Sequence, residues 1–184
     1  MNGEGTAPRA IAVLIGAPGS GKTKTGKRVA RALGADFIDT DKVVVAEHGP
    51  IAELFEREGE ARFRELERAA VAQALRRHAV VSLGGGAVLD PATQQDLAGL
   101  PVIELTVSRS GVEARLAEDP GAVAKRPLLR DGGIDAWERL VADRAALYAR
   151  LATVRVDTSR RPFDAVAAEV VAWLRDRMPE EERR

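Results

Sequence analysis

The sequence predicts an α/β fold, in which about five parallel strands are covered by helices on both faces. Short apolar runs recur along the chain, and stretches with helical spacing of apolar residues separate them. Such alternation is typical of a parallel sheet with crossover helices. The length of 184 residues, of which 45% are hydrophobic and 30% charged, suits one globular domain with its own core.

The expected elements follow one another in order from the N-terminus. The first strand is Ala10–Ile15, whose continuous apolar run suits a strand buried on both faces. Gly34 marks the end of the first helix, and Pro91 suits the first turn of a later one. Further strands are expected at 36–39, 79–83, 101–107 and 153–158. Helices are expected at 22–34, at 51–77 with a break near 58–60, and at 91–100, 110–118, 135–152 and 163–177.

The chain is expected to form a single domain over residues 1–184, with irregular ends. Residues 1–9 resemble a flexible leader, and the charged residues 179–184 are expected to fray. Residues 116–133 are polar, hold two prolines and three glycines, and are longer than an ordinary connection. In an α/β protein such a segment predicts a mobile lid.

Composition excludes several classes of site. Lys plus Arg and Asp plus Glu are both 28, so a zero net charge argues against a general nucleic-acid or membrane-surface binder. The absence of Cys excludes disulfides and thiol chemistry. The two histidines, His48 and His78, are 30 residues apart and are expected at the surface or at helix ends. No apolar run approaches the ~20 residues of a membrane span, so a cytoplasmic protein is expected.

A phosphate-binding loop occupies Gly16–Thr23, with the sequence GAPGSGKT. It meets the pattern G-x-x-x-x-G-K-[ST] between an expected strand and an expected helix. The glycines let successive N–H groups face an anion, and the helix N-terminus adds positive charge. Lys22 is expected to reach the β- and γ-phosphates, and Thr23 to ligate Mg²⁺. The loop predicts a nucleoside triphosphate site, which switches, motors and kinases all share.

Two features at the ends of expected strands are candidates for an acceptor site. Asp39 and Asp41 follow the second strand, where one carboxylate suits the water shell of Mg²⁺ and another an acceptor hydroxyl; an Asx turn capping the next helix is the alternative. Three glycines, Gly84 to Gly86, follow the third strand and would let a ligand approach the backbone, or form only a flexible turn.

Three arginines are further candidates. Arg64 lies three residues before Glu67 on one helix, so the two can pair, either as part of a site or on a solvated face. Arg126 falls in the expected lid, and Arg144 on the helix after it. Alone, neither would indicate a function.

Taken together, these segments resemble the shikimate kinase family. The resemblance covers nearly the whole chain, in matching order and spacing. It rests on the phosphate loop and on DTD, GEARFRELE, SLGGGA, KRPLL, DRAALY and VDTSRRPFDAV. It implies a P-loop kinase-type three-layer α/β/α fold with a mobile lid. It also implies transfer of the ATP γ-phosphoryl group to the 3-hydroxyl of shikimate.

The resemblance also implies roles for single residues. Lys22, Asp41 and Arg126 would be catalytic; Thr23 and Asp39 would hold Mg²⁺, Asp39 through water. Arg64 and Arg144 would clamp the shikimate carboxylate, a contact suited to the guanidinium fork. ATP would contact Gly19, Ser20, Gly21, Lys22, Thr23, Lys24, Arg126 and Arg161. Shikimate would contact Asp41, Arg64, Gly85, Gly86 and Arg144, beside an apolar wall of Phe55 and Phe63.

A few positions depart from the family pattern. Ala146 stands where a proline is common, and Val45 where a glutamate is expected. The stretch GPIAELF is one residue short, and the lid is long and acidic, with Glu118 and Asp119. None of these departures removes a residue that is expected to contact ATP, Mg²⁺ or shikimate.

Other functions remain open at this point. A gluconate or nucleoside monophosphate kinase would share the architecture, although adenylate-type loops usually have Gly after the lysine. A non-catalytic nucleotide-binding module is a different class, and it would not require the retained Asp41, Arg64, Arg126 and Arg144. The expected partners are small molecules alone, with no nucleic acid and no membrane, and the expected state is a monomer.

Overall fold

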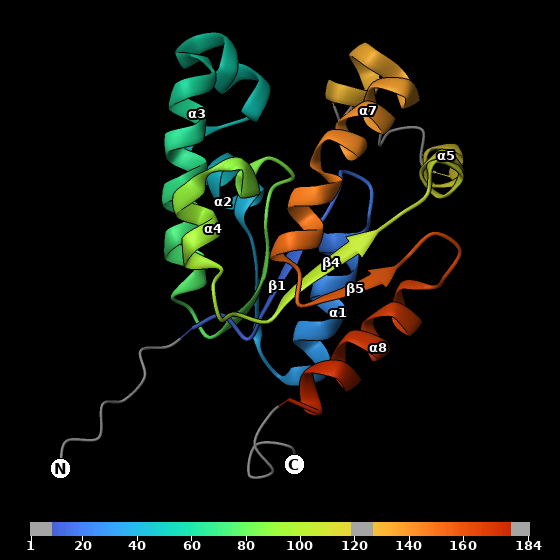
Figure 1. Cartoon of the computed structure of the whole chain (residues 1–184). Helices are drawn as coiled ribbons and strands as arrows, with labels where there is room; N and C mark the ends of the chain where they lie inside the picture. The colour runs from blue at the N-terminus through green and yellow to red at the C-terminus, as the bar shows by residue number, and fades with distance from the viewer. Residues whose placement is uncertain (1–8, 119–126, 178–184) are drawn as a thin grey trace, which may run out of the picture.

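Five short strands form one parallel sheet in the computed structural model, which describes residues 9–118 and 127–177 (Figure 1). The expected parallel α/β sheet is therefore confirmed. In chain order the strands are β1 (Ala12–Ile15), β2 (Asp36–Asp39), β3 (Ala79–Ser82), β4 (Val102–Thr106) and β5 (Val154–Asp157).

The strand order β2-β3-β1-β4-β5 places β1 at the centre of the sheet. β1 is buried along its whole length, as its continuous apolar sequence predicts. Ser82 at the end of β3 is in register with Leu14 of β1 and with Asp39 of β2. The loops that follow β1, β2 and β3 therefore leave the sheet at the same edge, where ligands bind in open parallel sheets.

Helices cover both faces of the sheet. They are α1 (Lys22–Leu33), α2 (Thr40–His48), α3 (Ile51–Leu75), α4 (Pro91–Asp96), α5 (Arg109–Glu118), α7 (Pro127–Leu151) and α8 (Phe163–Arg175), with a 3₁₀ turn η1 at Ala87–Leu89. α1 and α8 pack Val29, Val166 and Val170 against one face of the sheet. α3 and α7 pack Val71 and Tyr148 against the other face.

Local signals account for several helix ends. α1 ends at Gly34, whose φ of 64° is left-handed and suits glycine. Asp90 caps α4 by accepting a hydrogen bond from the Thr93 N–H, ahead of Pro91 in the first turn. Gly59, with φ 81°, interrupts α3, which confirms the expected break near 58–60.

Two parts of the chain differ from expectation. α2 fills residues 40–48, for which no helix was expected. α7 begins at Pro127, eight residues before the expected start, and is kinked at Gly133. Part of the expected lid is therefore helical, and its residues 119–126 lie outside the described residues. So do residues 1–8 of the expected leader and residues 178–184, which include the whole expected tail. Within the described ranges, no helix is both long and apolar enough to cross a membrane.

Candidate phosphotransfer site

The phosphate loop joins β1 to α1, as its sequence predicts. Gly16, Gly19 and Gly21 have φ of 136°, 87° and 92°, which glycine adopts without strain. A Cβ atom on Gly16 would lie 2.3 Å from the Leu105 carbonyl oxygen. One on Gly21 would lie 2.2 Å from the ring of Phe163. Backbone conformation and lack of space both require glycine in this loop.

Side chains at the start of α1 tie the loop together. The Lys22 Nζ donates to the carbonyl oxygens of Gly16, at 2.8 Å, and Ala17, at 3.1 Å. The Thr23 hydroxyl donates to Asp39 Oδ2 at 2.7 Å and so links the loop to the end of β2. A cavity of about 450 Å³ opens here. It is lined by Pro18, Gly19, Gly21, Lys22, Thr23, Lys24, Asp39, Asp41, Ser82, Leu83, Gly85, Arg115 and Phe163.

The two aspartates after β2 do different things. Asp39 caps α2, because its Oδ1 accepts from the Lys42 N–H at 3.4 Å while its Oδ2 accepts from Thr23. The expected Asx-type cap therefore exists alongside the contact to the phosphate loop. Asp41 lies one residue into α2 and lines the cavity. Burial, followed by the nearby charges of Asp39 and Glu67, raises the pKa of Asp41 to about 6, with Lys22 and Arg64 opposing the rise.

The glycine run after β3 brings the backbone close to charged side chains. A Cβ on Gly84 would lie 2.3 Å from Asp41 Oδ1 and 2.8 Å from Glu67 Oε1. A Cβ on Gly86 would lie 2.6 Å from Arg64 Nη1. The run is thus more than a flexible turn, because a Cβ atom at Gly84 or Gly86 would displace these charged side chains.

Arg64 pairs with a buried carboxylate. Its Nη1 donates to Glu67 Oε2 at 2.7 Å, and its Nη2 lies 3.1 Å from Glu60 Oε1. Glu67 is only 4% exposed, so the alternative of a fully solvated surface pair is wrong. Burial raises the pKa of Glu67, and the guanidinium groups of Arg64 and Arg144 oppose that rise.

Arg144 reaches the same glycine segment from α7. Its Nη1 donates to the Gly85 carbonyl oxygen at 2.9 Å, and the hydroxyl of buried Tyr148 donates to the same oxygen at 2.8 Å. Arg64 and Arg144, 80 positions apart in the sequence, therefore both border Gly84–Gly86. A second cavity of about 270 Å³ adjoins Arg64. It is lined by Arg64, Glu67, Arg68, Gly86, Ala87, Leu89, Asp90 and Thr93.

Two aromatic rings stand beside Arg64. The ring centroids of Phe55 and Phe63 are 4.9 Å apart, with Phe63 buried and Phe55 half-buried. The Arg64 guanidinium lies 5.1 Å from the centre of the Phe63 ring. Neither ring is in the lining of the two cavities, so their role as an apolar wall of the acceptor site stays a prediction.

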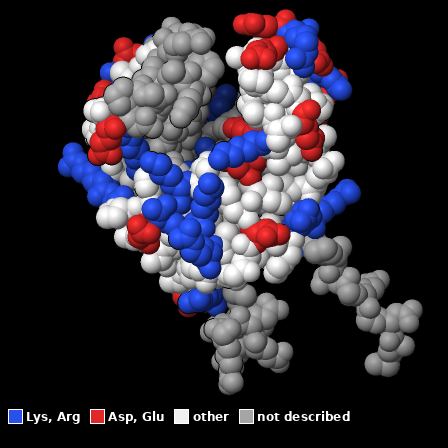
Figure 2. Space-filling model, turned by 180° about the vertical axis from the view of Figure 1, so that it is seen from behind, with Lys and Arg blue, Asp and Glu red and all other residues white. Residues whose placement is uncertain are grey.

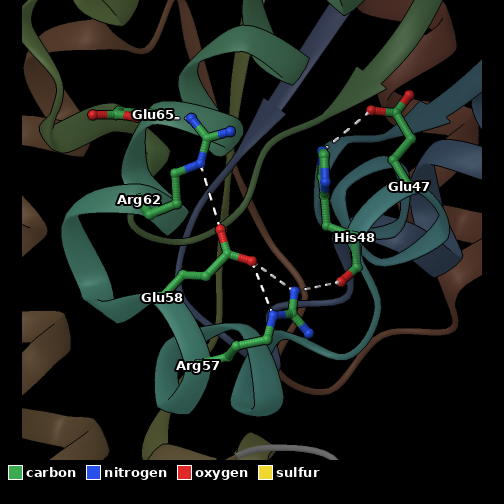
Figure 3. Close-up of polar contacts among 6 residues, drawn as sticks. All are labelled: Glu47, His48, Arg57, Glu58, Arg62 and Glu65. Carbon is green, nitrogen blue, oxygen red and sulfur yellow. Dashed lines mark hydrogen bonds and ion pairs between the residues drawn. The ribbon is translucent and has the colours of Figure 1, made fainter.

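A polar network joins the end of α2 to the kinked start of α3 (Figure 3). Arg57 donates to Glu58 at 2.8 and 3.0 Å and to the His48 carbonyl oxygen at 3.5 Å. Glu58 lies 3.6 Å from Arg62, and the His48 ring lies 3.6 Å from Glu47. His48 ends α2 and His78 is exposed, as expected for both histidines. Because these pairs are exposed, each contributes little to stability, and the network serves to connect the two helices.

Some expected residues are not brought to the cavities. Arg161 lies 2.6 Å from Glu169 on α8 and is absent from the linings of both cavities. Arg126 lies outside the described residues. Ser20 is fully buried in the loop. The departures Val45 and Ala146 are both exposed.

Sequence reasoning missed Arg115 and Phe163. Arg115 Nη1 donates to the Gly19 carbonyl oxygen at 2.6 Å, and its guanidinium lies 4.9 Å from the Phe163 ring centre. The only available signal was position, since α5 follows β4 at the ligand-binding edge of the sheet.

The oxygen atoms of Thr23 and Asp39 fit a Mg²⁺ site. Both are hard donors next to the phosphate loop, and Mg²⁺ is commonly held by one or two protein oxygens with phosphates and water. The described residues hold no cluster of three or more His, Cys, Asp or Glu side chains suited to a metal.

The phosphate loop, the strand order and the carboxylate beside the loop together define a P-loop kinase. Comparison with protein families matches residues 18–175 to the family described as "Shikimate kinase". The chain belongs to the shikimate kinase family.

Individual relatives agree with this membership. A shikimate kinase of Mycobacterium avium (strain 104) is 46% identical over 168 residues, covering 89% of this chain and 92% of its own length. One of Mycobacterium tuberculosis (strain ATCC 25177 / H37Ra) is 43% identical, covering 92% and 96%. A solved structure of shikimate kinase from Acinetobacter baumannii in complex with shikimate has a TM-score of 0.83 at 26% identity, covering 94% and 96%.

Proposed function

We propose that this enzyme transfers the γ-phosphoryl group of ATP to the 3-hydroxyl of shikimate. The observation that carries the proposal is the position of Asp41. It lies between the phosphate loop and the glycine run, with Lys22 and Arg64 near enough to affect its pKa. A carboxylate there can accept a hydrogen bond from an acceptor hydroxyl that lies next to the nucleotide phosphates.

The phosphate loop supplies the nucleotide side. The N–H groups of residues 19–23 cradle the phosphates, and Lys22 moves from the Gly16 and Ala17 carbonyls to the transferring phosphate. Thr23, with Asp39 through water, would hold Mg²⁺, which would supply positive charge against the phosphate oxygens. Arg126 is a further proposed contact to ATP, and Arg161 would have to leave Glu169 to reach the nucleotide.

The acceptor side holds shikimate by its carboxylate. Arg64 and Arg144 bind that group as forked donors, while Glu67 keeps Arg64 in place through their 2.7 Å contact. The N–H groups of Gly85 and Gly86 contact the ring substituents. Phe55 and Phe63 close the apolar side.

Asp41 takes the proton. As the acceptor oxygen attacks the γ-phosphorus, its O–H proton passes to an Asp41 oxygen, and the bond to the β-phosphate oxygen breaks to leave ADP. A pKa of about 6 leaves Asp41 ionised at neutral pH and makes it a stronger base than an exposed aspartate. Positioning and charge stabilisation supply most of the remaining acceleration.

We infer the location, oligomeric state and partners of the enzyme from its composition. The enzyme acts on small molecules as a cytoplasmic monomer, without nucleic-acid or membrane partners. The balanced composition supports this scope, because neither a large net charge nor an excess of aromatic residues marks the chain.

Acceptor choice tests the proposal directly. A gluconokinase from Sinorhizobium meliloti 1021 shares the fold, with a TM-score of 0.62 at 23% identity, so fold alone does not select the acceptor. Purified enzyme with ATP and Mg²⁺ is given shikimate, gluconate, AMP or no acceptor, and ADP release is followed. We expect rapid ADP release and ³¹P signals of shikimate 3-phosphate with shikimate alone. Phosphorylation of gluconate or AMP instead would refute the proposal.

A further inference from the structure

Five consecutive carbonyl groups of the phosphate loop accept hydrogen bonds from side chains. Lys22 donates to the first two, those of Gly16 and Ala17. The next three accept from three separate elements: Trp137 of α7, Arg115 of α5 and Thr158 after β5. The nucleotide motif contains none of these three residues, so the motif alone does not fix the loop.

Trp137 forms the bond to Pro18. Its indole Nε1 donates to the Pro18 carbonyl oxygen at 2.7 Å. The side chain is 2% exposed and packs with Ala17, Val107 and Val112. A buried indole N–H requires a partner, and here the partner is backbone of the phosphate loop.

Thr158 forms the bond to Ser20. Thr158 is fully buried, and its hydroxyl lies 2.9 Å from the carbonyl oxygens of both Ser20 and Thr106. Arg115 donates to the Thr158 carbonyl oxygen and, at 3.1 Å, to its hydroxyl oxygen. The hydroxyl therefore joins the end of β4 to the phosphate loop.

These bonds orient the opposite sides of the same peptide groups. In a planar trans peptide the carbonyl of one residue points away from the N–H of the next. A fixed Pro18 carbonyl therefore fixes the Gly19 N–H, and a fixed Ser20 carbonyl fixes the Gly21 N–H. Left-handed glycines could otherwise rotate these peptide planes at little cost.

We propose that Trp137 and Thr158 are positioning residues that hold the Gly19 and Gly21 N–H groups toward the nucleotide phosphates. Both act through the backbone of the loop and touch neither substrate. The inference rests on the assignment of the loop as the nucleotide site. Their removal is expected to weaken nucleotide binding and leave shikimate binding unchanged.

Trp137→Phe tests the first contact, because it keeps an aromatic ring and removes the N–H. The chain has one other tryptophan, Trp173, half-buried on α8 and stacked 4.5 Å from Arg177, and Trp173→Phe is the matched control. Calorimetry with ADP and Mg²⁺ is expected to show about threefold to tenfold weaker binding for Trp137→Phe, the effect of one buried hydrogen bond. Trp173→Phe is expected to bind ADP like the wild type, and all three proteins to bind shikimate equally.

A pair of substitutions at Thr158 tests the second contact, even if Trp137→Phe folds poorly. Thr158→Val keeps the shape and removes the hydroxyl, whereas Thr158→Ser keeps the hydroxyl. We expect weaker ADP binding and a higher ATP KM only for valine, with recovery by serine.

Three outcomes separate the possibilities. ADP affinity within about twofold of wild type for both Trp137→Phe and Thr158→Val would overturn the inference. So would a serine variant as weak as the valine variant. A wild-type enzyme that binds no ADP would instead refute the assignment of the loop itself.

Discussion

Replacing Asp41 with asparagine should stabilise the protein while it disables the reaction. The folded chain holds the Asp41 proton more tightly than the unfolded chain, because the pKa is about 6 in the fold and 3.8 for a free side chain. The Asp41 contribution to stability is therefore most favourable below pH 3.8 and falls as the pH rises toward 6. Above pH 6 the ionised carboxylate destabilises the fold by about 3 kcal/mol.

Asparagine keeps the shape of Asp41 and removes this charge. We expect Asp41→Asn to raise the free energy of unfolding at pH 8 by about 1–3 kcal/mol, a rise in Tm of roughly 3–10 °C for a domain of this size. The gain should shrink by about half at pH 5, where the wild-type carboxyl is largely protonated in the fold. Asp36→Asn, an exposed change on β2, is the control and should show no comparable gain.

Urea unfolding at pH 5 and pH 8, followed by circular dichroism, measures the gain in the free energy of unfolding at each pH. A gain that is the same at both pH values, or a less stable variant at pH 8, would refute the reasoning. In parallel, wild-type kcat/KM should fall as the pH drops through about 6, because protonated Asp41 cannot accept the hydroxyl proton. Asp41→Asn should lose turnover at every pH and keep its ADP affinity.

Four other substitutions probe the site. Arg64→Ala and Arg144→Ala should each weaken shikimate binding by about 10–100-fold in calorimetry, since a charge-assisted contact is worth about 1.5–3 kcal/mol. Lysine at either position should not restore binding fully. Shikimate affinity within about twofold of wild type for both alanine variants would show that the acceptor site lies elsewhere. Lys22→Ala should lower kcat by about 10²–10³-fold in a coupled ADP assay, and near-normal turnover would remove Lys22 from catalysis. Gly84→Ala should raise the shikimate KM far more than that of ATP, because its Cβ would meet Asp41 and Glu67 within 3 Å; unchanged kinetics would show that both carboxylates can move aside.

The fold was predictable wherever local signals and hydrophobic periodicity agree. β2 has the expected limits, and Gly34, Gly59 and Pro91 act where the sequence indicated. α2 escaped prediction because Val43 to Val45 are three consecutive β-branched residues without a helical pattern. The capping contact from Asp39 and packing against α3 support the helix there.

The site was predictable where a motif fixes the chemistry. The phosphate loop and the aspartates after β2 meet as their positions in the sequence implied. Trp137 and Thr158 were missed because an indole or a hydroxyl acquires such a role only from what the fold places beside it. Arg161 is the opposite case, a residue expected at the site that the fold places elsewhere. Its pairing with Glu169 depends on where α8 lies, which the sequence pattern did not indicate.

The basic residues of α1 have a kinetic consequence. Lys24, Lys27 and Arg31 are exposed along the helix that starts at the phosphate loop, and Figure 2 shows Lys and Arg gathered in a band on the face seen from behind. The formal net charge is zero, so this band is a local concentration of positive charge within a neutral molecule. Its field reaches about 8–10 Å into a physiological salt solution and draws anions toward that side. ATP should therefore meet the enzyme more often than random collision predicts, and added salt should slow its arrival more than its departure.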